Sequence, residues 1–320
     1  MIKRSQKTVP PSQRLCLKAF LPIEEDLESR VLNALSSDYW RNLNPTLSLG
    51  KAAPTRHAKD ASFSSDSPNR YMHHLLQEGY FQTPVMLPQS LLRRMLKGIE
   101  TVRNAGWPGV FAFLYDDFWT AFRHPILKRL LTANLGLPYR QLPYIWAHYV
   151  GPNSSGWPPH VDGGGRPKLS VWLPLTEATL DNGCIYVVRR NQKTDALAQS
   201  FAKRERYRYA ELVTLMRNSR ALPVPAGSFL GWGPELIHWG SASGETACPR
   251  ISIAVEFTSD LASPPAKGLP FLDADSELPS FNTRLLVVAR AVQLYENFEP
   301  ALARSQILAE KIISQVGTAQ

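Results

Sequence analysis

The spacing of apolar residues divides the chain into a helical beginning, a strand-rich centre and a helical end. Apolar residues recur at intervals of three and four in three early segments. We expect helices over residues 24–37, 90–106 and 116–136. Asp116 suits the N-cap of the third helix, Gly106 suits the C-cap of the second, and Pro125 is expected to kink or split the third. Residues 44–70 are rich in Ser, Pro, Ala and charge without periodicity, which indicates a long loop.

Between residues 142 and 260 the pattern changes to short β-branched and aromatic runs separated by Gly, Pro or Asn. The runs read YIWAHYV, KLSVWLPL, GCIYVV, SFLGW and RISIAVEF. This pattern is typical of an all-β sandwich or barrel. In the last run, alternate residues Arg250, Ser252, Ala254 and Glu256 share one face of the expected strand. Such a face is ordinarily solvated, but its small side chains also suit the lining of a barrel with room for a ligand.

A basic segment interrupts the strands, and two helices follow them. Residues 203–220 have a helical pattern and carry Lys203, Arg204, Arg206, Arg208, Arg217 and Arg220. This segment is either a solvated helix face or a lid that attracts an anionic substrate. Apolar stripes predict further helices over residues 283–298 and 301–316. We expect one domain over residues 1–320, with helices and loops over 1–141, a β core over 142–260, a helical insert over 195–220, and helices over 261–320.

The composition is that of an ordered chain. The 320 residues are 44% hydrophobic and 20% charged, which suffices for one large core or for two domains. A net charge of +9 fits a nucleic acid, a membrane surface or an anionic small molecule, although a soluble enzyme of basic composition is the simpler interpretation. The three cysteines lie far apart and match neither a disulfide framework nor a zinc motif. No apolar signal segment or membrane span is evident, so we expect a cytoplasmic protein without membrane contact.

The stretch GWPPHVDGGGR places a histidine and a carboxylate two residues apart. If this segment is extended, His160 and Asp162 point to the same side and could reach one metal ion. The two prolines before them favour an extended approach, and the three glycines after them let the backbone turn away. The alternative is a surface loop with both side chains in water. The two-residue spacing alone does not decide between a metal site and such a loop.

A third ligand has to come from elsewhere in the chain. His238, in GWGPELIHWGS, sits where a strand enters a turn flanked by glycine, although a packed histidine between aromatic residues has the same surroundings. His148 lies on a strand-like run and is equally consistent with a buried, hydrogen-bonded residue. Arg250 would need an anionic partner inside a barrel, because a buried unpaired guanidinium is costly, and a dicarboxylate could bind it in a bidentate fork. An exposed strand arginine is the alternative.

The ordered set of these motifs resembles the phytanoyl-CoA dioxygenase family. The set comprises HVD at 160–162, DNGC at 181–184, AGSF at 226–229, His238 followed by WGS, and RIS at 250–252. The similarity spans roughly residues 142–260. It implies a mainly β fold with flanking α-helices around a double-stranded β-helix, the jelly-roll core of cupin-like proteins. It also implies a non-haem oxygenase that uses Fe(II), 2-oxoglutarate and O2.

The resemblance assigns roles to individual residues. It implies catalytic iron ligation by His160, Asp162 and His238. It implies binding of the co-substrate 2-oxoglutarate by Arg250, Ser252, Trp172 and Tyr149. In related halogenases a small residue replaces the carboxylate ligand, so an aspartate here favours hydroxylation or a similar oxidation.

The expected activity is oxidation of an unactivated C–H of a small molecule, in secondary metabolism or amino-acid tailoring. The run Arg189–Arg190–Asn191 replaces the family's usual Pro-Gly-Ser-His-like turn, and Ser228 replaces an acidic residue, so a CoA ester is not inferred. An anionic substrate is one option, no nucleic-acid partner is expected, and the oligomeric state stays open. Two alternatives remain: a cupin-like metal-binding protein without oxygenase activity, and a basic protein directed to nucleic acid.

Overall fold

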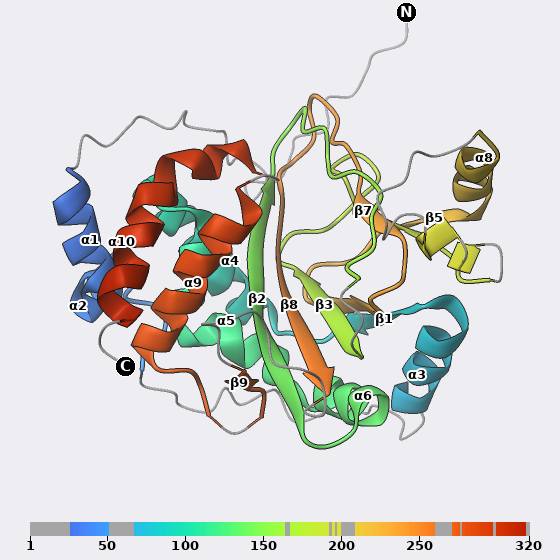
Figure 1. Ribbon diagram of the computed structural model, residues 1–320, viewed down its shortest axis with the longest axis horizontal. Helices are drawn as coiled ribbons and strands as arrows, with labels where there is room; N and C mark the ends of the chain where they lie inside the picture. The colour runs from blue at the N-terminus through green and yellow to red at the C-terminus, as the bar shows by residue number, and fades with distance from the viewer. Residues whose placement is uncertain are drawn as a thin grey trace, which may run out of the picture.

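Two antiparallel sheets form the centre of the molecule, and helices pack around them (Figure 1). The computed structural model describes residues 26–50, 67–163, 167–191, 194–195, 197–199, 209–259, 271–275, 277–296 and 299–317. Over these ranges, helices hold more residues than strands. The fold is therefore mixed α and β with antiparallel sheets, which corrects the predicted mainly β class.

All five predicted central runs form strands, and strands from outside residues 142–260 extend the sheet. The larger sheet contains β1 (Tyr80–Val85), β6 (Ser228–Trp232), β3 (Lys168–Pro174), β8 (Arg250–Ser259), β2 (Tyr139–Val150) and β9 (Leu272–Asp273), in that order. The smaller sheet contains β5 (Ser219–Leu222), β4 (Ile185–Val188) and β7 (His238–Gly240). β1 pairs antiparallel with β6 and β9 with β2, so chain segments on both sides of the central region join one sheet.

Helices precede, interrupt and follow the strands. The described α-helices are α1 (Leu27–Leu35), α2 (Ser37–Leu43), α3 (Ser67–Glu78), α4 (Gln89–Asn104), α5 (Asp116–Thr120), α6 (Pro125–Leu135), α8 (Tyr209–Asn218), α9 (Phe281–Tyr295) and α10 (Gln306–Gly317). Shorter 3₁₀ turns are η2 (Gly109–Leu114), η3 (Ala121–Arg123) and η4 (Pro300–Ser305). Pro125 splits the third predicted helix, because it can occupy the first position of α6 but not a helix interior. Gly106 follows α4 with φ of 78°, as expected of a helix end.

Three expectations about helix limits need correction. The predicted helix over 203–220 ends at Asn218, because the next residues pair with β4 as strand β5. Its basic stretch 203–208 lies outside the described residues. The segment predicted as one helix over 301–316 begins with the 3₁₀ turn η4 before α10. Asp116 does not cap α5: it is the first residue of that helix, and no side-chain hydrogen bond caps it.

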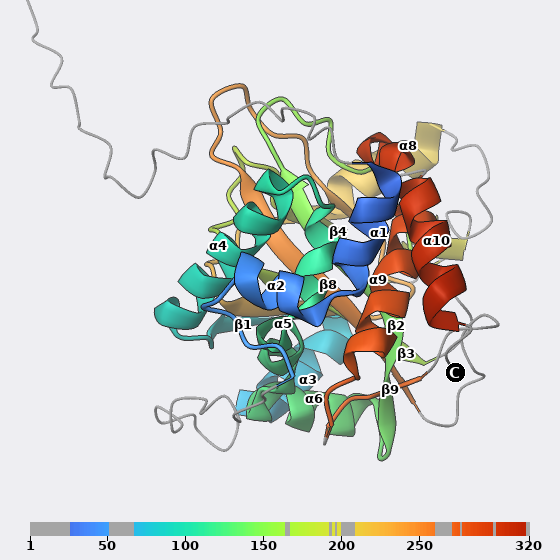
Figure 2. The ribbon, with the colours of Figure 1, turned by 90° about the vertical axis from the view of Figure 1, so that its left-hand side faces the viewer.

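The two faces of the larger sheet contact different partners. Helices α1, α2, α4, α9 and α10 gather on one side of β2 and β8 (Figures 1 and 2). The alternation in β8 matches the prediction, since Ile251 and Ile253 enter the main core on that side. On the other side, Trp172 from the larger sheet clusters with Ile185 from the smaller sheet. The sheets therefore pack against each other and enclose the space in which the candidate site lies. No helix in the described ranges has both the length and the apolar character that crossing a membrane requires.

Candidate metal centre

Three predicted side chains meet at the space between the sheets. The backbones of His160 and His238 lie antiparallel, with N–H to carbonyl distances of 3.0 and 2.9 Å. Asp162 Oδ1 lies 3.8 Å from His160 Nε2 and 3.6 Å from His238 Nε2. Atoms that share an ion at about 2.0–2.2 Å can be no more than roughly 4.4 Å apart. The spacing thus suits one metal ion, and within the described residues this is the one such cluster of His, Cys, Asp and Glu side chains.

The histidine rings are held in the tautomer that a metal site requires. His160 Nδ1 lies 2.9 Å from the carbonyl of Pro158, and His238 Nδ1 lies 2.9 Å from the carbonyl of Leu236. A carbonyl oxygen can only accept, so each Nδ1 carries a proton, and in the neutral ring Nε2 then keeps its lone pair. Burial also lowers the pKa of His238 to about 4, despite the opposing charge of Asp162. Both rings therefore present a ligand atom toward the carboxylate.

Asp162 is partly buried, with a side chain 16% exposed, and strongly hydrogen-bonded. Its Oδ2 accepts from Ser170 Oγ at 2.6 Å and from Trp232 Nε1 at 2.9 Å. Desolvation by itself would raise the pKa of this carboxyl, but the electrostatic interactions with His238 and Lys168 and the Ser170 hydrogen bond together lower it. The ionised carboxylate offers Oδ1 toward the two Nε2 atoms.

A cavity of about 120 Å³ adjoins these three side chains. Its lining comes from both sheets and from α9. The tyrosine and tryptophan side chains of the lining are Tyr144, Trp146, Trp157, Trp172, Trp232 and Tyr295. The described part of the chain thus holds its candidate ligands beside a mainly apolar space into which a small molecule could fit.

Arg250 contributes a buried positive charge to the same cavity. The residue is 3% exposed, and its Nη1 donates to Ser252 Oγ at 3.2 Å. No carboxylate within the described residues pairs with it. Burial lowers its pKa to about 10, which still leaves the guanidinium charged at neutral pH. The buried ring of Trp172 lies 5.5 Å from its Cζ. A ligand with an anionic group would compensate this charge.

Tyr149 is not part of the cavity, in contrast to its predicted role. Strand alternation places its neighbour His148 on the cavity face of β2 and Tyr149 on the opposite face. There the Tyr149 ring packs on the main core, with the Arg103 Cζ 3.3 Å from its centroid. Among the residues predicted to contact the co-substrate, Trp172 and Arg250 therefore line the cavity and Tyr149 does not.

Within the described residues, no other histidine belongs to the cluster of three candidate ligands. His148 lines the cavity, and burial together with the charges of Arg250 and His160 lowers its pKa to about 3. His124 accepts a hydrogen bond from the Ile126 N–H and caps α6. His74 bonds the carbonyl of Tyr80. His73 lies on α3, and His57 lies outside the described residues.

The sequence interpretation missed several residues that shape this site. Ser170 lies on the same face of β3 as Trp172, two positions away, so strand alternation could have identified it. Trp232 pairs with Ser170 across the sheet, which no local pattern reveals. Tyr295 reaches the cavity from α9, which is far away in sequence.

Part of the chain matches the sequence model of a known protein family. Residues 112–252 match the sequence model of a family described as Phytanoyl-CoA dioxygenase (PhyH). No curated protein matches the sequence.

Solved structures of low sequence identity share the fold. The epimerase SnoN, in complex with Fe3+, alpha ketoglutarate and nogalamycin RO, has 15% identity and a TM-score of 0.50, over 68% of this chain and 97% of SnoN. The Ni complex of the non-heme monooxygenase ThoJ has 16% identity and a TM-score of 0.50, over 76% of this chain and 99% of ThoJ. Apo ThoJ has 14% sequence identity and a TM-score of 0.51, over 78% of this chain and 100% of ThoJ. Residues 112–252 are thus similar in sequence to the phytanoyl-CoA dioxygenase family, and the described fold is shared with these solved structures.

Proposed function

We propose that this protein is a non-haem Fe(II)- and 2-oxoglutarate-dependent oxygenase that hydroxylates, or otherwise oxidises, an unactivated C–H of a small molecule. The observation that carries the proposal is the approach of two histidine Nε2 atoms and one carboxylate oxygen beside a cavity with a buried arginine that no carboxylate of the described residues pairs with. Two neutral imidazoles and a carboxylate are the donor set that Fe(II) prefers in such enzymes.

Different residues of the site would bind the iron and the co-substrate. His160, Asp162 and His238 would hold the iron and leave its other positions open. Arg250, with Ser252 beside it, would bind the distal carboxylate of 2-oxoglutarate, and Trp172 would pack along it. Bound Fe(II), with 2-oxoglutarate and O2, supplies the oxidising power, and succinate and CO2 are released. The aromatic lining excludes water from the reacting groups.

We also propose that the two sheets form a double-stranded β-helix and that the chain is one oxygenase domain. Antiparallel sheets packed face to face around the candidate site support the first part. β1 and β9, which lie before and after the central region in the sequence, both join the larger sheet, and Tyr295 of α9 lines the cavity. These contacts support the proposal of a single domain. An anionic group on the substrate stays a prediction, because residues 203–208 lie outside the described ranges.

Succinate formation tests the proposed activity without knowledge of the substrate. The protein is incubated with Fe(II), ascorbate, 2-oxoglutarate and O2, and succinate is measured by mass spectrometry. We expect slow formation that stops with a chelator and returns when Fe(II) is restored. A metal-binding cupin-like protein without oxygenase activity would bind the ion and form no succinate.

Replacing Arg250 by methionine is expected to raise KM for 2-oxoglutarate by more than about 100-fold with a smaller effect on kcat. Charge-assisted hydrogen bonds contribute about 1.5–3 kcal/mol each, and the lost fork would remove two of them. 2-Oxobutyrate lacks the distal carboxylate, so the wild-type preference for 2-oxoglutarate should disappear in the variant. Arg189→Met, which breaks an exposed pair with Glu78, is the matched control. An unchanged preference in Arg250→Met would refute this role.

A further inference from the structure

The carboxylate of Asp162 is asymmetric in its contacts. Oδ2 accepts both hydrogen bonds, from Ser170 Oγ at 2.6 Å and Trp232 Nε1 at 2.9 Å, whereas Oδ1 faces the histidine Nε2 atoms. The two donors come from adjacent strands, where Ser170 and Trp232 stand opposite each other in register. Rotation of the carboxylate would break both bonds, so its orientation is fixed by the larger sheet.

Trp232 contacts a second candidate ligand as well. Its ring centroid lies 4.5 Å from that of His238, with the planes at 44°. The residue is only 5% exposed, and its neighbours in the sheet hold it from both sides, because β6 pairs with β1 and β3. One side chain therefore orients both the aspartate and a histidine of the site.

We propose that Trp232 and Ser170 are positioning residues that restrict Asp162 to one metal-facing oxygen. This inference rests on the proposed function. A carboxylate that binds through one oxygen occupies one coordination position, whereas a rotated carboxylate could occupy two. Positions that remain open are those required for 2-oxoglutarate and O2. The pair thus contributes to metal affinity and keeps room for the co-substrate.

Removing these donors is expected to weaken metal binding in a cooperative manner. Trp232→Phe keeps the ring against His238 and loses only the N–H, and Ser170→Ala loses only the hydroxyl. Loss of such an outer hydrogen bond lowers metal affinity about 10–100-fold. Because one remaining donor can still engage Oδ2, the double variant should lose more than the two single losses combined. Anaerobic titration calorimetry with Fe(II), then with 2-oxoglutarate, measures both affinities.

Matched variants separate positioning from general destabilisation. Trp107→Phe removes an N–H that donates to Tyr39 Oη at 2.9 Å, remote from the site. Ser228→Ala removes a buried hydroxyl that has no hydrogen-bond partner. Both should bind Fe(II) as the wild type does. Unchanged Fe(II) and 2-oxoglutarate affinity in the folded double variant would overturn the inference. Absence of Fe(II) binding in the wild type would instead overturn the proposed function.

A separate feature concerns the wall of the cavity. The ring of Tyr295 stacks on that of Trp146, with centroids 4.3 Å apart and planes at 30°. The ring centroid of Trp157 lies 6.3 Å from that of Tyr295 and 6.2 Å from that of His160. The aromatic wall formed by Trp146, Trp157 and Tyr295 therefore reaches the candidate metal ligands. Tyr295 belongs to α9, outside the residues that match the family.

We infer that this wall recognises a flat, uncharged ring in the substrate. The carboxylate near it, Glu256, is already paired with Lys168 at 2.9 Å, so the wall offers ring faces rather than a free charge. Aromatic pairs gain about 0.5–1.5 kcal/mol beyond burial of their area. Tyr295 would then be a residue that determines substrate specificity at the proposed site.

Two probes of similar size test this preference. 2-Naphthol and its saturated analogue decahydro-2-naphthol are titrated by ligand-observed NMR into protein loaded with Zn(II) and 2-oxoglutarate. We expect the wild type to bind the aromatic probe about 2–10-fold more tightly. Tyr295→Ala should remove the difference and Tyr295→Phe should keep it. Equal binding of both probes by the wild type, or a preference that persists in Tyr295→Ala, would overturn the inference whether or not succinate is formed.

Discussion

Replacing His160 by alanine is expected to lower Fe(II)-dependent succinate formation by more than about 100-fold. The reason is that His160 Nε2 is one of the three candidate ligand atoms that the described part of the chain brings together, and its ring is already oriented by the Pro158 carbonyl. Loss of an outer hydrogen bond alone costs about 10–100-fold in affinity or activity, so loss of a ligand should exceed it. Asp162→Ala and His238→Ala should behave in the same way.

The control for this series is a histidine outside the site. His73 is exposed on α3, and His73→Ala should retain wild-type succinate formation. Thermal unfolding of each variant shows whether the fold is intact. Wild-type activity in a folded His160→Ala protein would contradict the assignment of that residue as a ligand.

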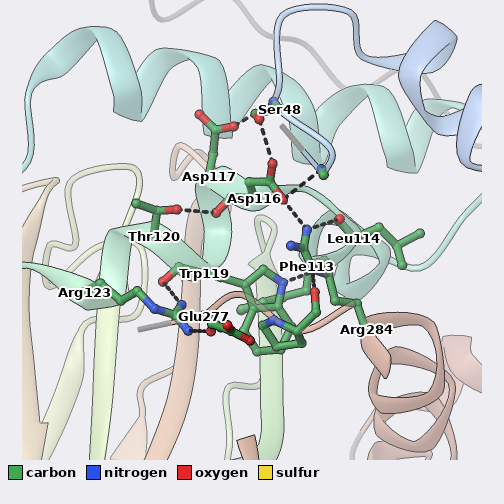
Figure 3. Close-up of polar contacts among 12 residues, drawn as sticks. Ser48, Phe113, Leu114, Asp116, Asp117, Trp119, Thr120, Arg123, Glu277 and Arg284 are labelled. Carbon is green, nitrogen blue, oxygen red and sulfur yellow. Dashed lines mark hydrogen bonds and ion pairs between the residues drawn. The ribbon is translucent and has the colours of Figure 1, made fainter. Parts of the chain in front are cut away.

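A second large effect is expected from a buried ion pair far from the site. Arg284 of α9 contacts the Asp116 carboxylate at the start of α5, and their side chains are 4% and 3% exposed (Figure 3). The same guanidinium donates to the carbonyls of Leu114 and Pro279 at 2.8 and 2.7 Å. Asp116 also accepts from Ser48 Oγ at 2.6 Å. The network joins the N-terminal region, α5 and the helix that carries Tyr295.

Arg284→Met is expected to lower the free energy of unfolding by about 3–5 kcal/mol, because it leaves a buried carboxylate without its counter-ion. Urea unfolding at neutral pH measures the loss. Adding Asp116→Asn removes the stranded charge, so the double variant should be less destabilised than the sum of the single changes. Arg41→Met breaks an exposed pair with Asp38 and should cost less than about 1 kcal/mol. A similar, small loss in Arg284→Met would refute the role of the pair.

The same network predicts how acid affects stability. Burial would raise the pKa of Asp116, but the Ser48 hydrogen bond and the Arg284 charge together lower it. A lowered pKa means that the unfolded chain takes up the proton more readily than the folded chain. The contribution of Asp116 is therefore fully present above the unfolded value of about 4 and is lost as the pH falls through the lowered pKa. In the Asp116→Asn background this part of the acid sensitivity should be absent.

Local patterns in the sequence predicted the strands and which side chains share a strand face, whereas the ligand set followed from the family resemblance. Alternation in RISIAVEF predicted that Arg250 and Glu256 share one face of the strand, and in the structure both line the cavity. The two-residue spacing of His160 and Asp162 predicted side chains on one side of an extended segment, and both reach the same site. These inferences succeeded because strand periodicity is a property of the backbone itself.

Other features depend on contacts between distant segments. Asp116 was expected to cap a helix, yet its carboxylate pairs with Arg284, which lies 168 positions further along the chain. Tyr149 was assigned by resemblance alone, and the alternation of β2 turns it to the opposite face from His148. Trp232 gains its role from its register opposite Ser170. Such pairings are set by tertiary packing, which local periodicity does not encode.

The position of a bound iron tests the central claim most directly. Crystals grown anaerobically with Fe(II) and 2-oxoglutarate would be measured on both sides of the iron absorption edge. We predict one anomalous peak per chain, about 2.0–2.3 Å from His160 Nε2, Asp162 Oδ1 and His238 Nε2. A peak elsewhere, or none at these three atoms in crystals that contain iron, would contradict the account.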